Sequence, residues 1–511
     1  MAREKGYFSK SDFTKGFQCP KVLWMDAHMH EKFDESLIDQ ARLDAGNEIG
    51  DMAMAYFGKF VEVKQSFQFD KMAAETAELI AEAARAIEHG EAFSVCEATF
   101  KYGHMVCMAD IVRVRDAKTL DIIEVKSSTK LKEYHVNDLA YQTAVVQACG
   151  YDVASASVMH INSDYVLDGE LDLQGFFAIE DMTDEAKARA HDVARTVADF
   201  MTYKTAEVEP EVEIGPQCNS PFACGYQTWC WRHVADADIF SLAGMGRTRA
   251  LGRLNEGISS FGDAMAGIKL TALQRAQITA ETGGGDTANI EELTKFLEGV
   301  TYPVYHLDFE TVQPIVPRYQ GTKPWQQVPT QFSVHKVEAP GASPKHAEFL
   351  AEHDADPRRA IAEALCATIP ADACVTAYNM GFEKGRIREL ADQFPDLADH
   401  LMGIHDGIID LMVPFRSGWV YLKAMQGSYS IKKVLPALCP DDPDLDYAAL
   451  EGVHNGTEAI IAFEQLDDAD PAKRQEVREQ LLRYCELDTL AMVKVHERLI
   501  EIAKHGIVKP I

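Results

Sequence analysis

Two interruptions of the regular hydrophobic pattern constrain this chain most, because they divide it into pieces of domain size. One lies near residues 236–242, directly after a segment rich in Cys and Trp, and the other is the glycine-rich stretch 282–287. A chain of 511 residues is too long for one ordinary hydrophobic core. We therefore expect three pieces, formed by residues 1–235, by a mainly helical segment 236–298, and by residues 299–511.

The first and last of these pieces combine short apolar strands with amphipathic helices, a pattern typical of the α/β class. In the last piece, apolar runs predict strands over residues 303–310, 331–337 and 374–378. An amphipathic pattern predicts a long helix over residues 486–503. We therefore expect a multidomain α/β protein in which a helical segment joins two α/β domains.

The composition favours a globular protein of the cytoplasm. The hydrophobic content is 47%. The sequence has no apolar stretch of about 18 residues, the length of a membrane-spanning helix, and its first residues lack the apolar segment of a signal peptide. We therefore expect no membrane partner. Eleven cysteines, an odd number without a secretion signal, predict thiols, some of them metal ligands, rather than a disulfide framework.

The formal net charge of −30 argues against long-range attraction to nucleic acid, because phosphate binding is driven by Lys and Arg side chains that displace counterions. A nuclease that binds cations through clustered carboxylates can nevertheless be acidic overall and keep a local basic groove. The charge alone therefore does not exclude nucleic acid as a partner.

Acidic side chains in the last piece form a pattern that indicates a metal site. Asp308 and Glu310 are two residues apart on a predicted strand, so both side chains leave the same face. Burying two adjacent acids costs heavily unless a cation is bound. An exposed edge strand would instead leave both acids solvated. Tyr484 and Asp488 are four residues apart and therefore share one face of a helix.

A further acidic residue, Glu383, follows the strand predicted over 374–378, at the start of a helix that Asn379 is suited to cap. In this order the three segments resemble the three motifs of the DEDD exonuclease superfamily, and the Tyr-x3-Asp pattern marks its DEDDy branch. The resemblance covers residues 302–502. It implies an RNase H-like fold that releases nucleotides from the 3′ ends of nucleic acids.

The resemblance also implies two Mg²⁺ or Mn²⁺ ions that activate water and stabilise the leaving 3′ oxygen. The implied metal ligands are Asp308, Glu310, Glu383 and Asp488. Oxygen ligands without His or Cys favour these hard cations, and Tyr484 is expected to position the attacking water. Glu383 departs from the family, which usually has Asp at this position. Asp410 and residues 428–433 resemble the family's secondary segments and are given supporting roles.

The first piece contains a second polar constellation, on a predicted hairpin. Strands are predicted over residues 105–114 and 120–126, joined by a turn that contains Asp and Lys. Asp110 lies on the first strand, and Glu124 and Lys126 lie on the same side of the second. A hairpin with polar residues at its end is common in itself. The helix that follows adds a ridge at four-residue steps, formed by Asp138, Gln142, Val146 and Gly150.

This constellation resembles the PD-(D/E)XK nuclease fold in its RecB-like branch. The residues that match its D…ExK and Q-x3-Y motifs are Asp110, Glu124, Lys126 and Gln142. The resemblance implies that the two acids bind a divalent metal, while the lysine orients water and offsets developing charge. Val146 replaces the usual Tyr, and residues 46–50 lack the usual metal-ligand His, for which Glu97 is a candidate substitute. We expect either a second nuclease site or a DNA-binding platform that has lost its chemistry.

Four cysteines form a third pattern. Cys218, Cys224 and Cys230 are separated by gaps of five residues, and Cys19 lies far earlier in the chain. One early and three late cysteines around a RecB-like domain resemble its iron–sulfur subgroup, which includes the CRISPR-adaptation exonucleases. The resemblance implies a [4Fe–4S] cluster that ties the first helix of the domain to its end. Zinc, which more often uses shorter cysteine spacings, and the absence of any metal are the alternatives.

The middle piece contains a segment, residues 251–264, that resembles a helix-hairpin-helix; a plain helical linker is the alternative. Arg247, Arg249 and Arg253 supply local positive charge there. The complete order of pieces resembles a bacterial family with this architecture. We therefore predict a metal-dependent nuclease that acts on the ends of DNA, or alternatively RNA, in repair, recombination or defence. The alternative function is a catalytically silent scaffold that binds nucleic acid.

Overall fold

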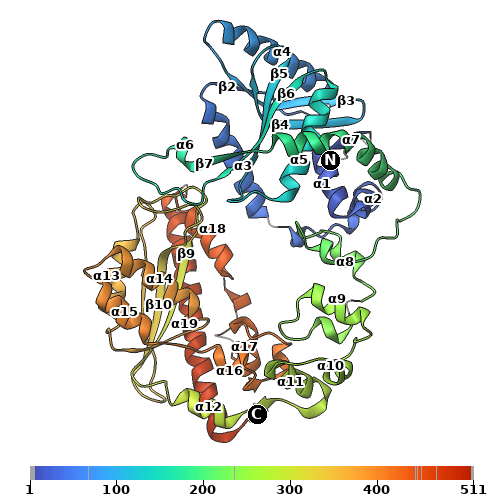
Figure 1. The fold of residues 1–511 in the computed structure, drawn as a ribbon. Helices are drawn as coiled ribbons and strands as arrows, with labels where there is room; N and C mark the ends of the chain where they lie inside the picture. Colours follow the sequence, from blue (N-terminus) through green and yellow to red (C-terminus); the bar gives the residue numbers. More distant parts are fainter. Residues whose placement is uncertain are drawn as a thin grey trace. The chain divides into compact units, whose positions relative to one another are not determined.

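The computed structural model describes residues 6–38, 40–66, 68–234, 236–442, 445, 447–450, 452–467 and 469–507. The chain divides into two compact units. The first unit contains residues 1–235 together with the short segment 315–324, and the second contains residues 236–314 and 325–511. Each unit combines a β-sheet with helices (Figure 1). The chain is therefore a multidomain α/β protein, as its sequence predicts, and residues 236–298 are part of the second unit.

The first unit is built on a seven-stranded sheet in the order β2-β3-β4-β5-β6-β7, with β1 paired to β4. Its strands are β1 (Phe8–Ser9), β2 (Phe60–Glu62), β3 (Ser94–Tyr102), β4 (Met105–Val114), β5 (Thr119–Lys126), β6 (Asp152–Ile161) and β7 (Phe177–Asp181). β4 is antiparallel to both β3 and β5, and β5 runs parallel to β6. The predicted hairpin is therefore present, and it lies in the middle of the sheet.

Helices complete the first unit: α1 (Lys10–Gln18), α2 (Pro20–His28), α3 (Gln40–Met54), α4 (Phe69–Glu88), α5 (Glu133–Ala148), α6 (Leu173–Phe176), α7 (Thr183–Lys204) and α8 (Gln227–Cys230). α4 packs on β3 and buries Met72, Thr76, Ile80 and Ala83. Their spacing of three or four residues gives one buried stripe. α5 contacts the sheet on one side and α7 on the other, so most of its residues are buried.

The second unit is built on a five-stranded sheet in the order β11-β10-β9-β12-β13. Its strands are β9 (Val304–Val312), β10 (Val328–Val337), β11 (Lys345–Leu350), β12 (Cys374–Ala377) and β13 (Ile408–Asp410). β9 is antiparallel to β10 and parallel to β12, which places it at the centre of the sheet. A separate two-stranded sheet pairs β8 (Thr287–Ala288) with β14 (Val420–Tyr421).

The α-helices of the second unit are α9 (Arg247–Asn255), α10 (Phe261–Gly267), α11 (Ala272–Thr279), α12 (Ile290–Leu297), α13 (Arg358–Thr368), α14 (Gly381–Gln393), α15 (Ala398–Asp406), α16 (Val413–Arg416), α17 (Ile431–Leu438), α18 (Gly456–Glu464) and α19 (Pro471–His505). Helix α19, which packs on β9 and β10, starts well before the predicted residue 486. Asp470 caps it by accepting from the amides of Ala472 and Lys473. The first turns of α19 are polar, so the hydrophobic pattern of the sequence does not indicate where this helix begins.

The connection between β9 and β10 includes segment 315–324, which belongs to the first unit. Gly321 donates its amide to the carbonyl of Leu167 at 2.8 Å, and Leu167 donates to Thr322 at 3.0 Å. The side chain of Gln320 also exchanges two hydrogen bonds with the backbone of Gly169. The chain therefore leaves the second unit and returns to it directly after the strand that carries Asp308 and Glu310. None of the described helices combines the length and the apolar run that a membrane crossing requires.

Candidate metal centres

Three carboxylates from two elements of the second unit lie close together. Asp308 and Glu310 are on one face of β9, because side chains two residues apart on a strand point the same way. Helix α19 packs on β9 and brings Asp488 to them. One carboxylate oxygen from each of the three residues lies within 4.8 Å of the others. We refer to these residues, together with Glu383, as the C-terminal centre.

Glu383 approaches this centre from the first turn of α14. Its side chain is 2% exposed, and its charge contributes to the raised pKa values of Asp308 and Glu310. Its Oε2 atom is buried and has no hydrogen-bond partner among the described residues. A buried carboxylate oxygen without a partner is costly, and a bound cation would satisfy it.

The expected capping role of Asn379 is wrong. The residue at the N-cap of α14 is Met380, and no side chain caps the helix there. Asn379 has a left-handed backbone with φ of 73°, whereas a capping residue adopts an extended conformation. Asp410, at the end of β13, accepts from the amides of Asn379 at 2.9 Å and Met412 at 3.0 Å. Asp410 therefore stabilises the turn that leads into α14 and, with it, the position of Glu383.

The carboxyl groups of the C-terminal centre share a shortage of positive charge. Burial, reinforced by the neighbouring acids, raises the pKa of Asp308 well above its ordinary value. Burial and Asp488 raise the pKa of Glu310 to about 8, and burial raises those of Glu383 and Asp488 to about 8 and about 6. Like charges cannot accumulate in a buried site without protons or a cation. The oxygen donors present suit Mg²⁺ or Mn²⁺.

Two tyrosines and a lysine border the centre. The hydroxyl of Tyr447 donates to Oδ1 of Asp488 at 2.6 Å, and Tyr484 also hydrogen-bonds to Asp488. The ammonium group of Lys432 lies 5.3 Å and 5.5 Å from the ring centroids of Tyr447 and Tyr484. It donates to the carbonyl of His454 at 2.8 Å and lowers the pKa of Glu310. Tyr447 escaped the sequence analysis because it lies outside any motif or periodic segment.

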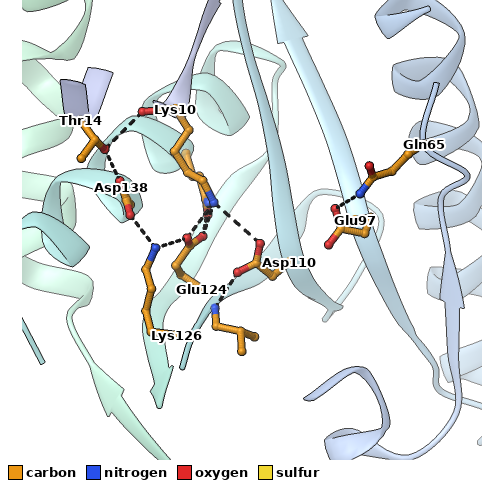
Figure 2. A network of polar contacts seen from close by, with 10 residues as sticks. Lys10, Thr14, Gln65, Glu97, Asp110, Glu124, Lys126 and Asp138 are labelled. Carbon is orange, nitrogen blue, oxygen red and sulfur yellow. Dashed lines mark hydrogen bonds and ion pairs between the residues drawn. The ribbon is translucent and has the colours of Figure 1, made fainter. Parts of the chain in front are cut away.

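The second acidic site lies in the first unit and is shown in Figure 2. Asp110 on β4 accepts from the amide of Val125 at 2.7 Å. Glu124 on β5 accepts from Lys126 at 2.7 Å and from the side-chain amide of Gln142 on α5. Lys126 also donates to Asp138 at 2.7 Å. We refer to Asp110, Glu124, Lys126, Asp138 and Gln142 as the N-terminal centre.

Lys10, which the sequence analysis missed, reaches into the N-terminal centre from the start of α1. Its ammonium donates to both oxygens of Glu124, at 2.7 and 2.8 Å, and lies 3.7 Å from Asp110 (Figure 2). Burial opposes the charged form of Lys10, yet Asp110 and Glu124 raise its pKa above the ordinary value. Burial would raise the pKa of Glu124, but Lys10 and Lys126 lower it to about 2. Lysines of the chain itself thus neutralise most of the negative charge of the N-terminal centre.

The remaining residues of the PD-(D/E)XK pattern are placed as follows. Glu97 on β3 accepts from Gln65 at 3.0 Å, and burial together with Asp110 raises its pKa to about 7. Val146 is fully buried in α5. Gly150 lies beyond the end of α5, so it does not continue the ridge. Residues 46–50 lie within α3, which contacts β5.

The four cysteines singled out by the sequence line one cavity, together with Lys21, Met25 and Tyr226. Cys19 lies between α1 and α2, Cys218 ends a short 3-10 helix (Pro216–Cys218), Cys224 lies in a loop, and Cys230 ends α8. Burial raises the pKa of Cys224 to about 11. Among the described residues, no three of these sulfurs lie within 4.8 Å of one another. The structure thus brings the four thiols to one cavity.

In the middle segment, α9 and α10 are joined by a turn in which Gly257 has a φ of 85°. Arg247 begins α9, and Arg253 on the same helix pairs with Glu256 at 2.6 Å. Ile239, Ala250 and Phe261 pack together in a small apolar cluster around these helices. The arginines of this segment therefore lie on a short helix that packs on this small cluster within the second unit.

Comparison with known protein families gives a match to part of the chain. Residues 305–430 match a protein family described as "Domain of unknown function (DUF2779)". The matched segment includes Asp308, Glu310, Glu383 and Asp410, and it ends before Tyr484 and Asp488. No curated protein and no solved structure matches the chain.

Proposed function

We propose that this chain is a metal-dependent nuclease whose C-terminal centre removes nucleotides from the 3′ ends of DNA, or alternatively RNA. The observation that carries the proposal is the meeting of Asp308, Glu310 and Asp488 within 4.8 Å, half-buried and short of positive charge. The sheet order, with three antiparallel strands continued by two parallel ones, agrees with the RNase H-like fold that the DEDDy resemblance implies.

The residues that would hold two Mg²⁺ or Mn²⁺ ions are Asp308, Glu310, Glu383 and Asp488. The ions would supply a nucleophilic water and stabilise charge on the leaving 3′ oxygen. Tyr447 holds one oxygen of Asp488 in place, and Tyr484, on the same helical face as Asp488, is positioned to orient the attacking water. Lys432 offers an ammonium group that can offset charge on the reacting phosphate.

For the first unit we propose a domain of the PD-(D/E)XK type that cleaves or binds DNA. The support is the hydrogen-bonded network of Asp110, Glu124, Lys126 and Gln142 on adjacent strands and a helix. The alternative function, a catalytically silent nucleic-acid-binding scaffold, is favoured for this unit by one observation. Lys10 already lies between its two acids.

We further propose that the four cysteines hold a [4Fe–4S] cluster. They line one cavity, and ligation by four cysteine thiolates suits such a cluster. Zinc, which more often uses shorter cysteine spacings in the sequence, is the alternative metal. Iron and sulfide analysis of protein purified without oxygen, with Cys224→Ser for comparison, tests this; stoichiometric zinc without iron would favour the alternative metal.

The nuclease proposal is tested with single-stranded DNA and RNA labelled at the 3′ or 5′ end, incubated with Mg²⁺ or Mn²⁺. We expect shortening from the 3′ end that Asp308→Ala abolishes and that the exposed-acid control Asp399→Ala preserves. Lys126→Ala reports any contribution of the N-terminal centre. Equal shortening by wild type and Asp308→Ala would refute the assignment of this activity to the C-terminal centre.

A further inference from the structure

The hydrogen-bonding capacity of Glu124 is fully used by the chain itself. Oε1 accepts from Lys10 and Lys126, each at 2.7 Å. Oε2 accepts from Lys10 at 2.8 Å and from Gln142. Two carboxylate oxygens offer about four lone-pair positions. A metal ion could therefore bind Glu124 only by displacing one of these donors.

Lys10 is the donor whose place coincides with that of a shared cation. Its ammonium is within 2.8 Å of both oxygens of Glu124 and 3.7 Å from Asp110, so it lies between the two acids (Figure 2). Gln142 reaches the same carboxylate, and its own amide oxygen is buried without a partner among the described residues. That oxygen is a further ligand that a cation in place of Lys10 could use.

The fold holds Lys10 in this position. Phe8 and Ser9, directly before it, pair with β4, the strand of Asp110. Ser9 and Asp12 form a reciprocal capping box at the start of α1. One turn further on, Thr14 donates to Asp138 of the centre. The lysine is therefore presented by a rigid, capped helix and is not a free surface side chain.

We propose that Lys10 is a built-in cation that occupies the metal position of the N-terminal centre and thereby blocks a latent divalent-metal site. Three carboxylates, Asp110, Glu124 and Asp138, face the ammonium groups of Lys10 and Lys126. Loss of the Lys10 charge leaves an excess of two negative charges, which suits one divalent cation. This inference rests on the PD-(D/E)XK-type centre proposed for the first unit, and it is independent of the activity of the C-terminal centre.

The test counts bound Mn²⁺ by electron paramagnetic resonance in full-length protein that carries Asp308→Ala and Asp488→Ala, so that the C-terminal centre no longer contributes. We expect no Mn²⁺ at the N-terminal centre of this background. Adding Lys10→Met should create a site for about one Mn²⁺ per chain, and adding Glu124→Gln should remove it again. Lys15→Met, on the same helix but paired with Asp26, is the control and should create no site.

Two results would overturn the proposal: no gain of Mn²⁺ with Lys10→Met, or Mn²⁺ in the background that Glu124→Gln removes. If Lys10→Met does not fold, Lys10→Gln, which keeps a donor to Glu124 without the charge, replaces it in the same comparison. A further comparison needs no Lys10 variant. In the otherwise natural chain, Glu124→Gln should leave the number of bound Mn²⁺ ions unchanged. A lower number would refute the proposal that Lys10 blocks this metal site. Equal Mn²⁺ binding by wild type and the background would instead refute the C-terminal metal centre, while the Lys10 comparison stands.

Discussion

The two acidic centres of this chain use similar residues but are neutralised in different ways. In the N-terminal centre, Lys10 and Lys126 donate directly to Glu124, and its pKa falls to about 2. In the C-terminal centre, burial among other acids raises the pKa values of Glu310 and Glu383 to about 8. The first centre receives its positive charge from the chain, whereas the second must take up protons or a cation from solution.

The position of one lysine accounts for this difference. Lys10 bridges two carboxylates because a capped helix delivers it between them. Lys432 is also close to its centre, but it donates to the carbonyl of His454 and lies over two tyrosine rings. It therefore moderates the charge of the C-terminal centre without filling the position of a cation.

The largest expected effect follows Asp308→Asn. In the proposed mechanism, several kcal/mol of transition-state stabilisation depend on the ions that this carboxylate would hold, so 3′ trimming should fall by about 10³-fold. In EDTA the same change should raise the free energy of unfolding by about 1 kcal/mol, because it removes one of several crowded acids. Single-turnover kinetics and urea unfolding measure the two effects. A less stable variant in EDTA would contradict the charge shortage described for this centre.

Glu124→Gln should have the opposite effect on stability. Removing this acid leaves the half-buried Lys10 and Lys126 without their shared partner, which should cost about 3 kcal/mol, the lower end of the range for a broken buried pair. Glu97→Gln is the matched control: Glu97 lies near Asp110, burial raises its pKa to about 7, and a neutral amide should be tolerated. Urea unfolding measures the free energy of unfolding of both variants, and only Glu124→Gln should lower it strongly. Equal stabilities would show that the lysines do not depend on Glu124.

The two centres should also differ in how their contributions to stability and metal binding depend on pH. The acids of the C-terminal centre have pKa values raised to about 6 and about 8. Their protonated forms are favoured in the folded state, so the metal-free protein loses stability as the pH rises from about 4.5 toward 8. A divalent cation competes with these protons, and the rise in melting temperature caused by Mg²⁺ should be larger near pH 8 than near pH 6.

The contribution of Glu124 should stay constant over the same interval. Its lowered pKa stabilises the fold at all pH values above its ordinary value of 4.5 and is lost only as the pH falls toward 2. Asp308→Asn should therefore weaken the pH-dependent effect of Mg²⁺, whereas Glu97→Gln should preserve it. A Mg²⁺ effect that is independent of pH in wild type would contradict the raised pKa values of the C-terminal acids.

Local patterns in the sequence predict much of this fold. The strand period put Asp308 and Glu310 on one face, and apolar runs located β4, β5, β9, β10 and β12, because both signals depend on near neighbours in the sequence. Lys10 and Tyr447 were missed because they reach their carboxylates from distant segments with no spacing rule to connect them. Segment 315–324 was missed for the same reason: its partners, Leu167 and Gly169, lie about 150 residues earlier.

The smallest expected effect concerns Lys432, with its neighbour Lys433 as the control. Lys433 is exposed and donates to Gln426 at 3.2 Å. Lys433→Met therefore removes a positive charge that is adjacent in the sequence but keeps the charge of Lys432, which acts on Glu310. Lys432→Met should lower the rate of 3′ trimming by about tenfold, the size of one moderate electrostatic contribution.

A purely structural role for Lys432 would lower the rate equally at every pH. Because Lys432 lowers the pKa of Glu310, its removal should also shift the acidic limb of the pH–rate profile toward higher pH. Lys432→Arg retains the charge and should keep the acidic limb close to its wild-type position, although its planar fork cannot reproduce the ammonium geometry. An unshifted profile in Lys432→Met would leave the charge shortage of the C-terminal centre intact but would remove Lys432 from the groups that moderate it.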